Sequence, residues 1–229
     1  MKPHVICHMV ASIDGRTLLD RWRPKDVVAK GPFERVYQEL NVDAWLVGRA
    51  TGQEYAKGTA YQAHANEWLP REAWFARREA QGYGIVLDPN GKIAWGRSDI
   101  EGDPIVVVLT EQVTEAHLAG LRADGVSYLF AGKTSLNLPE ALETLWRDLG
   151  VKRLLLQGGG VTNGAFLRAG VIDEISLIIL PAVDGAQGAP SVFDASREDA
   201  GQVAPVRSIT LDNHQVLEGG AVWLRYTVQ

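Results

Sequence analysis

The chain has 229 residues, of which 46% are hydrophobic, and its 28 acidic side chains outnumber 23 basic ones to give a net charge of -5. This charge argues against a nucleic-acid-binding protein, which usually presents a basic surface. The absence of a signal-peptide pattern and of any apolar run near the ~20 residues of a spanning helix predicts no membrane association. Cys7 is the only cysteine, which excludes an intramolecular disulfide and fits a reducing cytoplasm.

In the first part of the chain, short apolar runs alternate with segments of helical spacing. The runs predict strands over 4–12, 44–47, 83–88, 104–110 and 126–132. The spacing predicts helices over 31–40, from about Arg49 onward, and over 114–125. The tryptophan-containing segment 66–80 is also a candidate for a short helix.

The same alternation continues to about residue 183. A helix is predicted over 138–150, where Pro139 suits the first turn and Gly150 ends the pattern. Strands over 152–157 and 174–183 flank a helix that 166–170 completes. The tail adds strands over 208–217 and 221–228, with Asn213 expected in a bulge or turn.

This order of elements predicts an α/β fold. Alternating strands and helices favour a three-layer sandwich with a mostly parallel central sheet. The C-terminal hairpin is expected to add an antiparallel edge. No repeat or linker interrupts the pattern, so residues 1–229 are expected to form a single domain.

The most informative stretch is the glycine run Gly158–Gly160, which follows an apolar strand and Gln157. One interpretation is a flexible turn between a strand and a helix. The other is a phosphate-binding loop, because glycines let a phosphate approach backbone N–H groups at a helix N-terminus. The spacing matches neither the dinucleotide fingerprint of Rossmann folds nor a P-loop, since no Lys-Ser/Thr follows.

The sequence Val-Gly-Arg-Ala-Thr at residues 47–51 follows the second predicted strand. As an isolated pattern it is typical of a surface turn. In this position, however, Arg49 is able to bind a phosphate through two hydrogen bonds, and Thr51 is able to cap a helix while donating to a phosphate oxygen.

Two further polar segments follow predicted strands. Ser12, Asp14 and Arg16 lie in Ser-Ile-Asp-Gly-Arg, and Asp88 opens the sequence Asp-Pro-Asn-Gly. Both are typical of turns, in which Asp and Gly are routine residues. By composition alone, neither segment indicates a ligand. The five histidines and the single cysteine show no metal-ligand spacing, so no metal is expected.

Taken together, these motifs resemble the dihydrofolate-reductase-like superfamily. The closer resemblance is to the reductase domain of riboflavin biosynthesis, the 5-amino-6-(5-phosphoribosylamino)uracil reductases. It covers nearly the whole chain in order: S-x-D-G-R/K, V-G-x-x-T, V-L-D, L-x-x-G-G, and an ending similar to VIDEISLIILPAVDGA. The resemblance implies an NADPH-dependent reductase, and a homodimer.

The resemblance also assigns the cofactor to particular residues. Gly48, Arg49 and Thr51 would hold NADPH phosphates, with Arg49 placed for the 2′-phosphate, and Thr110 would lie near the adenosine. The pyrophosphate would be held by the run from the first glycine into the helix, namely Gly158, Gly159, Gly160, Val161 and Thr162. In the superfamily the first two glycines commonly share a cis peptide bond, which is expected here between Gly158 and Gly159.

By the same resemblance, the substrate is a pyrimidine ribosylamine phosphate whose ribosyl group is reduced to ribityl. The loop containing Ser12 would pass the nicotinamide and the substrate. Asp14 would position or protonate the substrate, and Arg16 would bind its phosphate or a ring oxygen. Asp88 and Gln157 are the other candidate substrate contacts.

The chain departs from the family at three points. It lacks the H-x-E and P-C-x-x-C motifs of the zinc deaminase, and it has Gln157 where the riboflavin reductases usually have Glu. The segment 17–30, between Ser-Ile-Asp-Gly-Arg and the first predicted helix, is also not a close match. Two alternatives therefore stay open. One is a pterin or folate reductase, whose buried carboxylate on the first helix would be Glu34, with Glu39 further along. The other is a non-catalytic NADPH-binding protein.

Overall fold

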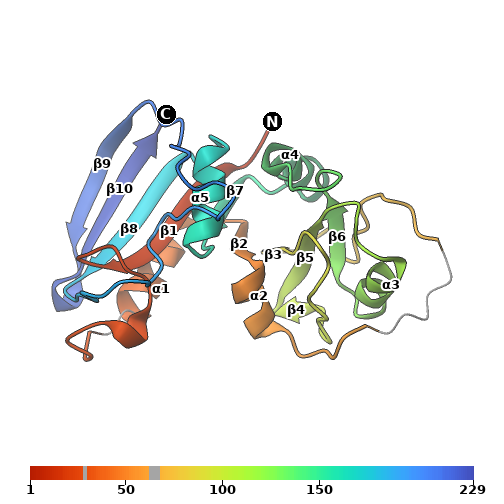
Figure 1. Cartoon of the computed structure of the whole chain (residues 1–229), viewed down its shortest axis with the longest axis horizontal. Coiled ribbons are helices and arrows are strands. Elements are labelled where there is room, and N and C mark those ends of the chain that lie inside the picture. Colours follow the sequence, from red (N-terminus) through yellow and green to blue (C-terminus); the bar gives the residue numbers. More distant parts are fainter. Residues whose placement is uncertain (28–29, 62–67) are drawn as a thin grey trace. The chain divides into compact units, whose positions relative to one another are not determined.

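The computed structural model describes residues 1–27, 30–61 and 68–229 (Figure 1). These residues form two compact units. Unit 1 comprises Met1–Pro3 and Asp43–Leu154, and unit 2 comprises His4–Val42 and Leu155–Gln229. The single domain expected from the sequence stays a prediction.

Unit 1 is built on a four-stranded parallel sheet. Its strands are β2 (Ala44–Gly48), β3 (Gly84–Leu87), β5 (Asp103–Leu109) and β6 (Ser127–Phe130), paired in that order. Every residue of β2 and β3 is buried, which explains why their sequences are continuous apolar runs rather than alternating ones. The short β4 (Asp99–Ile100), which the sequence did not predict, pairs antiparallel with the start of β5.

Within the described residues, unit 1 also contains three helices, and their ends follow the sequence signals. In α3 (Glu115–Ala123) the Thr114 side chain caps the first turn. In α4 (Leu138–Leu149) Asn137 is the N-cap, and Gly150 ends the helix in the left-handed conformation at φ 68°. The short α2 (Arg49–Tyr55) begins directly after β2, with Gly48 as its N-cap. Thr51 is therefore inside the helix, and its predicted capping role is wrong.

Unit 2 contains strands in the order β7-β1-β8-β10-β9. β1 (His4–Ser12) is parallel to β8 (Glu174–Leu180), and β8 is antiparallel to β10 (Val222–Val228). β10 pairs antiparallel with β9 (Ile209–Val216), and β7 (Arg153–Leu156) spans the boundary between the units. The helices are α1 (Lys30–Leu40) and α5 (Gly160–Arg168).

The predicted mostly parallel α/β architecture with an antiparallel C-terminal hairpin is confirmed. The bulge expected near Asn213 is present, because the pairing shifts between Arg225 and Tyr226 and leaves Asp212 without a partner in the ladder. The short helix expected over 66–80 is wrong where the structure describes it, from residue 68. There Trp74 forms a backbone bridge with Tyr128, so the segment extends along the outer edge of β6.

The sheet of unit 2 has one covered face and one open face. On the covered face the His8 ring stacks on Phe33 of α1 with ring centroids 4.8 Å apart. On the other face the side chains from β8, β10 and β9 are apolar except His214, by alternation from the paired register: Ile175, Leu177, Ile179, Val222, Leu224, Tyr226, Val228, Ile209, Leu211 and Val216. We call these residues the open face. Figure 1 shows no helix in front of these three strands.

None of the helices in residues 1–27, 30–61 and 68–229 has the length and apolar content needed to cross a membrane.

Candidate functional site

The glycine run lies in unit 2, between β7 and α5. Gly159 is the N-cap of α5, with φ -61° and ψ 164°, and no side chain caps this end of the helix. The first N–H groups of the helix are consequently not satisfied by a cap. The peptide between Gly158 and Gly159 is trans, since the only cis bond in the described residues is Arg23–Pro24, so that expectation is wrong.

The three glycines have different surroundings. A Cβ on Gly159 would meet nothing within 4 Å, whereas one on Gly160 would lie 2.3 Å from the Ser191 carbonyl oxygen. A Cβ on Gly158 would lie 2.6 Å from the Thr162 side chain. Gly158 and Gly160 are therefore required by packing within the protein, and only Gly159 leaves open space beside the helix N-terminus.

The residues that flank the run are accessible. Val161 is 49% exposed and Thr162 is half-buried on the first turn of α5. Gln157 is half-buried, and its side chain has no hydrogen-bond partner in the described part of the chain. Its amide is thus free to both donate and accept a hydrogen bond.

The loop that carries Asp14 is also in unit 2, at the end of β1. The Asp14 carboxylate accepts hydrogen bonds from the Ser12 hydroxyl at 2.6 Å and from the Gly185 N–H at 2.9 Å, with a further bond from Asp184 N–H. These hydrogen bonds, that of Ser12 first, hold the pKa of Asp14 well below its usual range. Asp14 is an exposed, ionised acceptor, so it is not suited to donate a proton.

Arg16 points toward the same segment of unit 2. Its Nη1 donates to the Ala189 carbonyl at 3.0 Å, and its backbone forms a bridge with Ser191. The side chain is half-buried. The remaining guanidinium N–H groups have no partner among the described residues, so they are available to an anion.

Unit 1 carries the other predicted cofactor residues. Gly48 is buried at the end of β2, while Arg49 is exposed and forms no ion pair with another described residue. Thr51 is half-buried in α2. β2, β3, β5 and β6 are parallel, so Arg49 lies on the same edge of this sheet as the residues that follow the other strands.

Two predicted site residues at this edge are buried in internal hydrogen bonds. Asp88 is fully buried, and its Oδ2 accepts from the N–H groups of Lys92 and Ile93 at 2.6 and 2.8 Å, which closes the turn after β3. Thr110 is also fully buried, and its hydroxyl donates to the Pro89 carbonyl at 2.7 Å. Both side chains thus hold the turn after β3 in place, and Asp88 Oδ1 is buried with no hydrogen-bond partner in the described residues.

No group of three or more His, Cys, Asp or Glu side chains arranged to hold a metal ion occurs in the described ranges. The predicted site residues offer the uncapped N-terminus of α5, the guanidinium groups of Arg16 and Arg49, and the amide of Gln157 as polar groups.

The family model described as the RibD C-terminal domain matches residues 3–222. The chain belongs to this family. The RibD C-terminal domain is the reductase domain that the sequence motifs resemble, and its fold is the dihydrofolate-reductase-like fold expected from them. Relatives in this family carry the names of a pyrimidinone phosphate reductase and of a riboflavin biosynthesis protein.

Relatives cover most of this RibD C-terminal domain protein. The chain is 30% identical over 204 residues to a 2,5-diamino-6-ribosylamino-4(3H)-pyrimidinone 5′-phosphate reductase of Aquifex aeolicus, covering 83% of this chain and 82% of the relative. A protein of the same name from Methanothermobacter thermautotrophicus is 29% identical over 224 residues, covering 95% and 98%. A pyrimidine reductase-like protein from Corynebacterium diphtheriae shares the fold, with a TM-score of 0.70, 18% identity and coverage of 99% and 92%.

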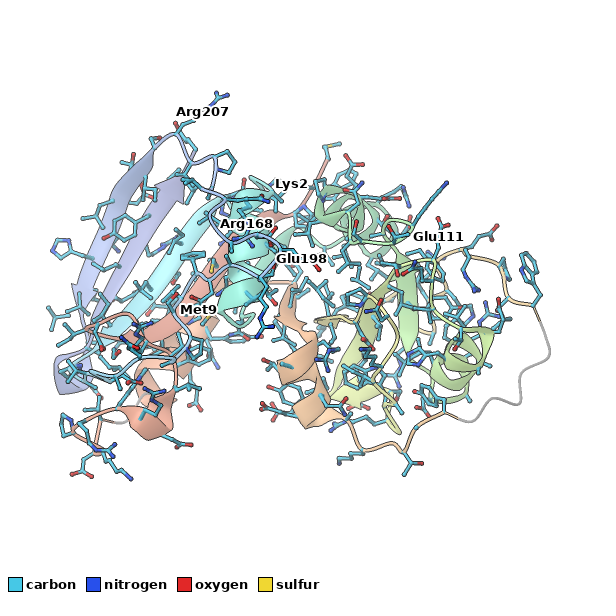
Figure 2. The ribbon with its side chains drawn as sticks, viewed as in Figure 1. Lys2, Met9, Glu111, Arg168, Glu198 and Arg207 are labelled. Atoms are coloured by element: carbon cyan, nitrogen blue, oxygen red, sulfur yellow. The ribbon has the colours of Figure 1, made fainter. Side chains whose placement is uncertain are left out.

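One part of the candidate site was not recognised from the sequence. The segment 182–194 supplies the backbone partners of Asp14 and Arg16, and it also contacts α5 (Figure 2, where Arg168 of α5 is labelled). Asp184 and Gly185, the partners of Asp14 in this segment, are separated from it by 170 and 171 residues. A local sequence pattern carries no signal for contacts at this separation.

Proposed function

We propose that this protein is an NADPH-dependent reductase that converts the ribosyl group of a pyrimidine ribosylamine phosphate to ribityl. Membership of the RibD C-terminal domain family supports the reaction class. The observation that carries the cofactor assignment is the open space at Gly159, beside the uncapped N-terminus of α5. A helix N-terminus with free N–H groups favours an anion such as a pyrophosphate.

The cofactor is assigned residue by residue. The backbone from Gly158 to Thr162 would bind the pyrophosphate, with Val161 and Thr162 at the exposed start of the helix. Arg49 would bind the 2′-phosphate, because its guanidinium is exposed and unpaired in the described residues and a guanidinium pairs well with phosphate oxygens. Thr110 would act only indirectly, by holding the turn after β3 against β5.

The reaction depends more on the alignment of NADPH with the substrate than on acid–base catalysis by side chains. The ribosylamine ring opens when its C1′–O4′ bond breaks and the nitrogen forms a C=N bond, while a proton moves from nitrogen to O4′. NADPH, held by the residues assigned above, would supply the hydride needed at C1′, and a proton on the imine nitrogen would complete the ribitylamine. The chain would hold the two partners in register, which is the usual contribution of a protein to hydride transfer.

The loop after β1, residues 12–17, would contribute charge and would position the substrate. We call it the substrate loop. Arg16 would bind the substrate phosphate or a ring oxygen through its free guanidinium N–H groups. Asp14 would act through the conformation of the loop, because its carboxylate is ionised and already hydrogen-bonded. We do not assign it the proton. Gln157 would contact the substrate as a neutral hydrogen-bonding group.

The substituent at C2 of the pyrimidine distinguishes two substrates. The relatives from Aquifex and Methanothermobacter carry names in which this carbon bears an amino group. The uracil suggested by the sequence motifs carries an oxygen there. Both compounds have the same ribosylamine phosphate, so the reduction is the same for both, and a comparison of the two belongs in the assay.

The structure gives no support to a pterin reductase. That activity needs a buried carboxylate on the first helix, and both Glu34 and Glu39 of α1 are exposed. The non-catalytic alternative makes a different prediction, which is cofactor binding without turnover.

A homodimer is proposed through the open face of unit 2. Three of its side chains, Ile209, Leu211 and Val216, are 52%, 49% and 72% exposed. An apolar patch of this kind on a sheet is typical of a protein–protein interface, and β9 also offers an unpaired edge. Analytical ultracentrifugation should give a dimer for the native chain and a monomer for Leu211→Glu. A monomeric native chain would contradict this assignment.

The function is tested by one assay. Purified protein is mixed with NADPH and each of the two pyrimidine ribosylamine phosphates, and oxidation of the cofactor is followed while the product is identified by mass spectrometry. The proposal expects a product that has gained two hydrogen atoms at the sugar. Cofactor binding with no oxidation on either substrate would favour the non-catalytic alternative.

A further inference from the structure

The segment 182–194 is bonded at one end to the loop after β1. Ile13 N–H donates to the Ala182 carbonyl at 2.8 Å, and Thr17 N–H donates to the Pro190 carbonyl at 3.1 Å. The Asp14 and Arg16 side chains add the bonds described above. The substrate loop and the first part of this segment are thus joined by both backbone and side-chain hydrogen bonds.

At its other end the same segment is bonded to the first turns of α5. Asp194 N–H donates to the Gly160 carbonyl at 2.9 Å, and Asn163 Nδ2 donates to the Val192 carbonyl at 2.9 Å. Asn163 is fully buried, so this bond is shielded from water. Arg168 donates to the Asp194 carbonyl at 3.3 Å and forms an ion pair with Asp199 at 2.9 Å.

Two glycines of α5 permit this contact. A Cβ on Gly164 would lie 1.8 Å from the Asp194 carbonyl oxygen, and one on Gly160 would lie 2.6 Å from Asp194 Oδ2. Both of these oxygen atoms belong to Asp194. Because any side chain at either position would displace Asp194, the helix and this residue fix each other's positions.

The Asp194 carboxylate completes the connection. Its Oδ2 accepts from the Ser191 N–H at 2.9 Å, and its Oδ1 accepts from the Ser191 hydroxyl at 2.7 Å. These bonds close a turn over residues 191–194. The turn presents the Asp194 N–H to the Gly160 carbonyl, immediately after the N-cap of α5. Removal of the carboxylate would free both ends of this turn.

We propose that Asp194 is a positioning residue for the cofactor, and that segment 182–194 couples the substrate loop to the glycine run. Asp194 acts through the first turn of α5, whose N–H groups bind the pyrophosphate in the proposed function on which this inference rests. A change in the turn at 191–194 is transmitted in the other direction to Asp14 and Thr17. Binding at the substrate loop and binding at the glycine run therefore favour the same arrangement of the segment.

The test compares three variants of the full chain. Asp194→Ala removes both acceptor bonds, and Asp194→Asn keeps one oxygen acceptor. Asp212→Ala is the matched control, because it removes an exposed carboxylate that bonds Thr227 on the β9–β10 hairpin of the same unit. Kd for NADPH, KM for NADPH and kcat are measured for each variant, together with hydrogen–deuterium exchange of residues 12–17.

The expected result is a larger change in Kd and KM for NADPH than in kcat. Asp194→Ala should raise Kd and KM for NADPH by about tenfold, the size expected for loss of a charge-assisted hydrogen bond, and should change kcat less. Asp194→Asn should recover part of this loss, and Asp212→Ala should match the native chain. Exchange at residues 12–17 should become faster in Asp194→Ala alone.

Two outcomes would overturn the inference. The first is an unchanged Kd for NADPH in Asp194→Ala. The second is a raised Kd with unchanged exchange at residues 12–17, which would remove the coupling. A native chain that neither binds nor oxidises NADPH would instead refute the proposed function itself, so the two failures are distinguishable. If Asp194→Ala does not fold, the intermediate Asp194→Asn variant carries the same comparison.

Discussion

Gly159→Ala separates a glycine that a ligand requires from a glycine that the fold requires. The backbone at this position, with φ -61° and ψ 164°, is open to any residue, and the added Cβ would meet nothing within 4 Å. The folded chain should therefore accept alanine without strain. The smaller conformational freedom of the unfolded chain favours the folded state by about 0.4–1 kcal/mol, but alanine is a poorer N-cap than glycine, so the free energy of unfolding should change by less than about 1 kcal/mol.

The affinity for NADPH should fall in Gly159→Ala. If a pyrophosphate lies against the Gly159 backbone, the new methyl group occupies part of its space and keeps it from the N–H groups of α5. We expect Kd for NADPH to rise at least tenfold, which corresponds to about 1.4 kcal/mol. Titration followed by tryptophan fluorescence measures the affinity, and chemical denaturation measures the stability.

Two other glycines serve as controls. Gly31→Ala, in α1, also adds a Cβ with nothing within 4 Å, and it should leave the affinity unchanged. Gly164→Ala should lower the free energy of unfolding by about 1–3 kcal/mol, because its Cβ would overlap the backbone of Asp194. An unchanged Kd in Gly159→Ala would refute the argument that the open space beside α5 receives the pyrophosphate.

Two more predictions concern charge. Arg49→Ala should weaken NADPH binding about tenfold or more and leave NADH binding unchanged, as measured by parallel titrations; equal losses for both cofactors would contradict the assignment of the 2′-phosphate. Burial lowers the pKa of His8 from 6.5 to about 4. The unfolded chain therefore takes up this proton first, and stability should fall by about 3 kcal/mol as the pH drops from 6.5 toward 4. Denaturation at several pH values should show a smaller fall in the free energy of unfolding for His8→Gln than for the native chain, whereas His214→Gln, at an exposed position, should match the native chain. Equal pH dependences for the native chain and His8→Gln would be inconsistent with a buried neutral imidazole.

Most elements of the fold could be predicted from the sequence because their patterns are local. The continuous apolar runs of β2, β3 and β5 are buried on both faces, as parallel strands require. Gly150 ends α4 in the left-handed conformation that its residue type favours. The helix expected within 66–80 failed because Trp74 pairs with Tyr128, a contact across more than fifty residues that no local period records.

The candidate site could be predicted less completely. The pattern of three glycines does not distinguish Gly159, which is open, from Gly160, which packs on Ser191. Asp88 matches a family motif and Thr110 follows a predicted strand, but the structure buries both side chains beside the turn after β3. Burial and long-range partners decide these cases, and both depend on the folded chain.

The central claim is that this member of the RibD C-terminal domain family reduces a pyrimidine ribosylamine phosphate with NADPH. The most direct measurement is the product of a single turnover with NADPH in which both hydrogens at nicotinamide C4 are replaced by deuterium. The account predicts one deuterium at C1′ of a ribityl product, with the other deuterium left on the oxidised nicotinamide. An unlabelled sugar would contradict it.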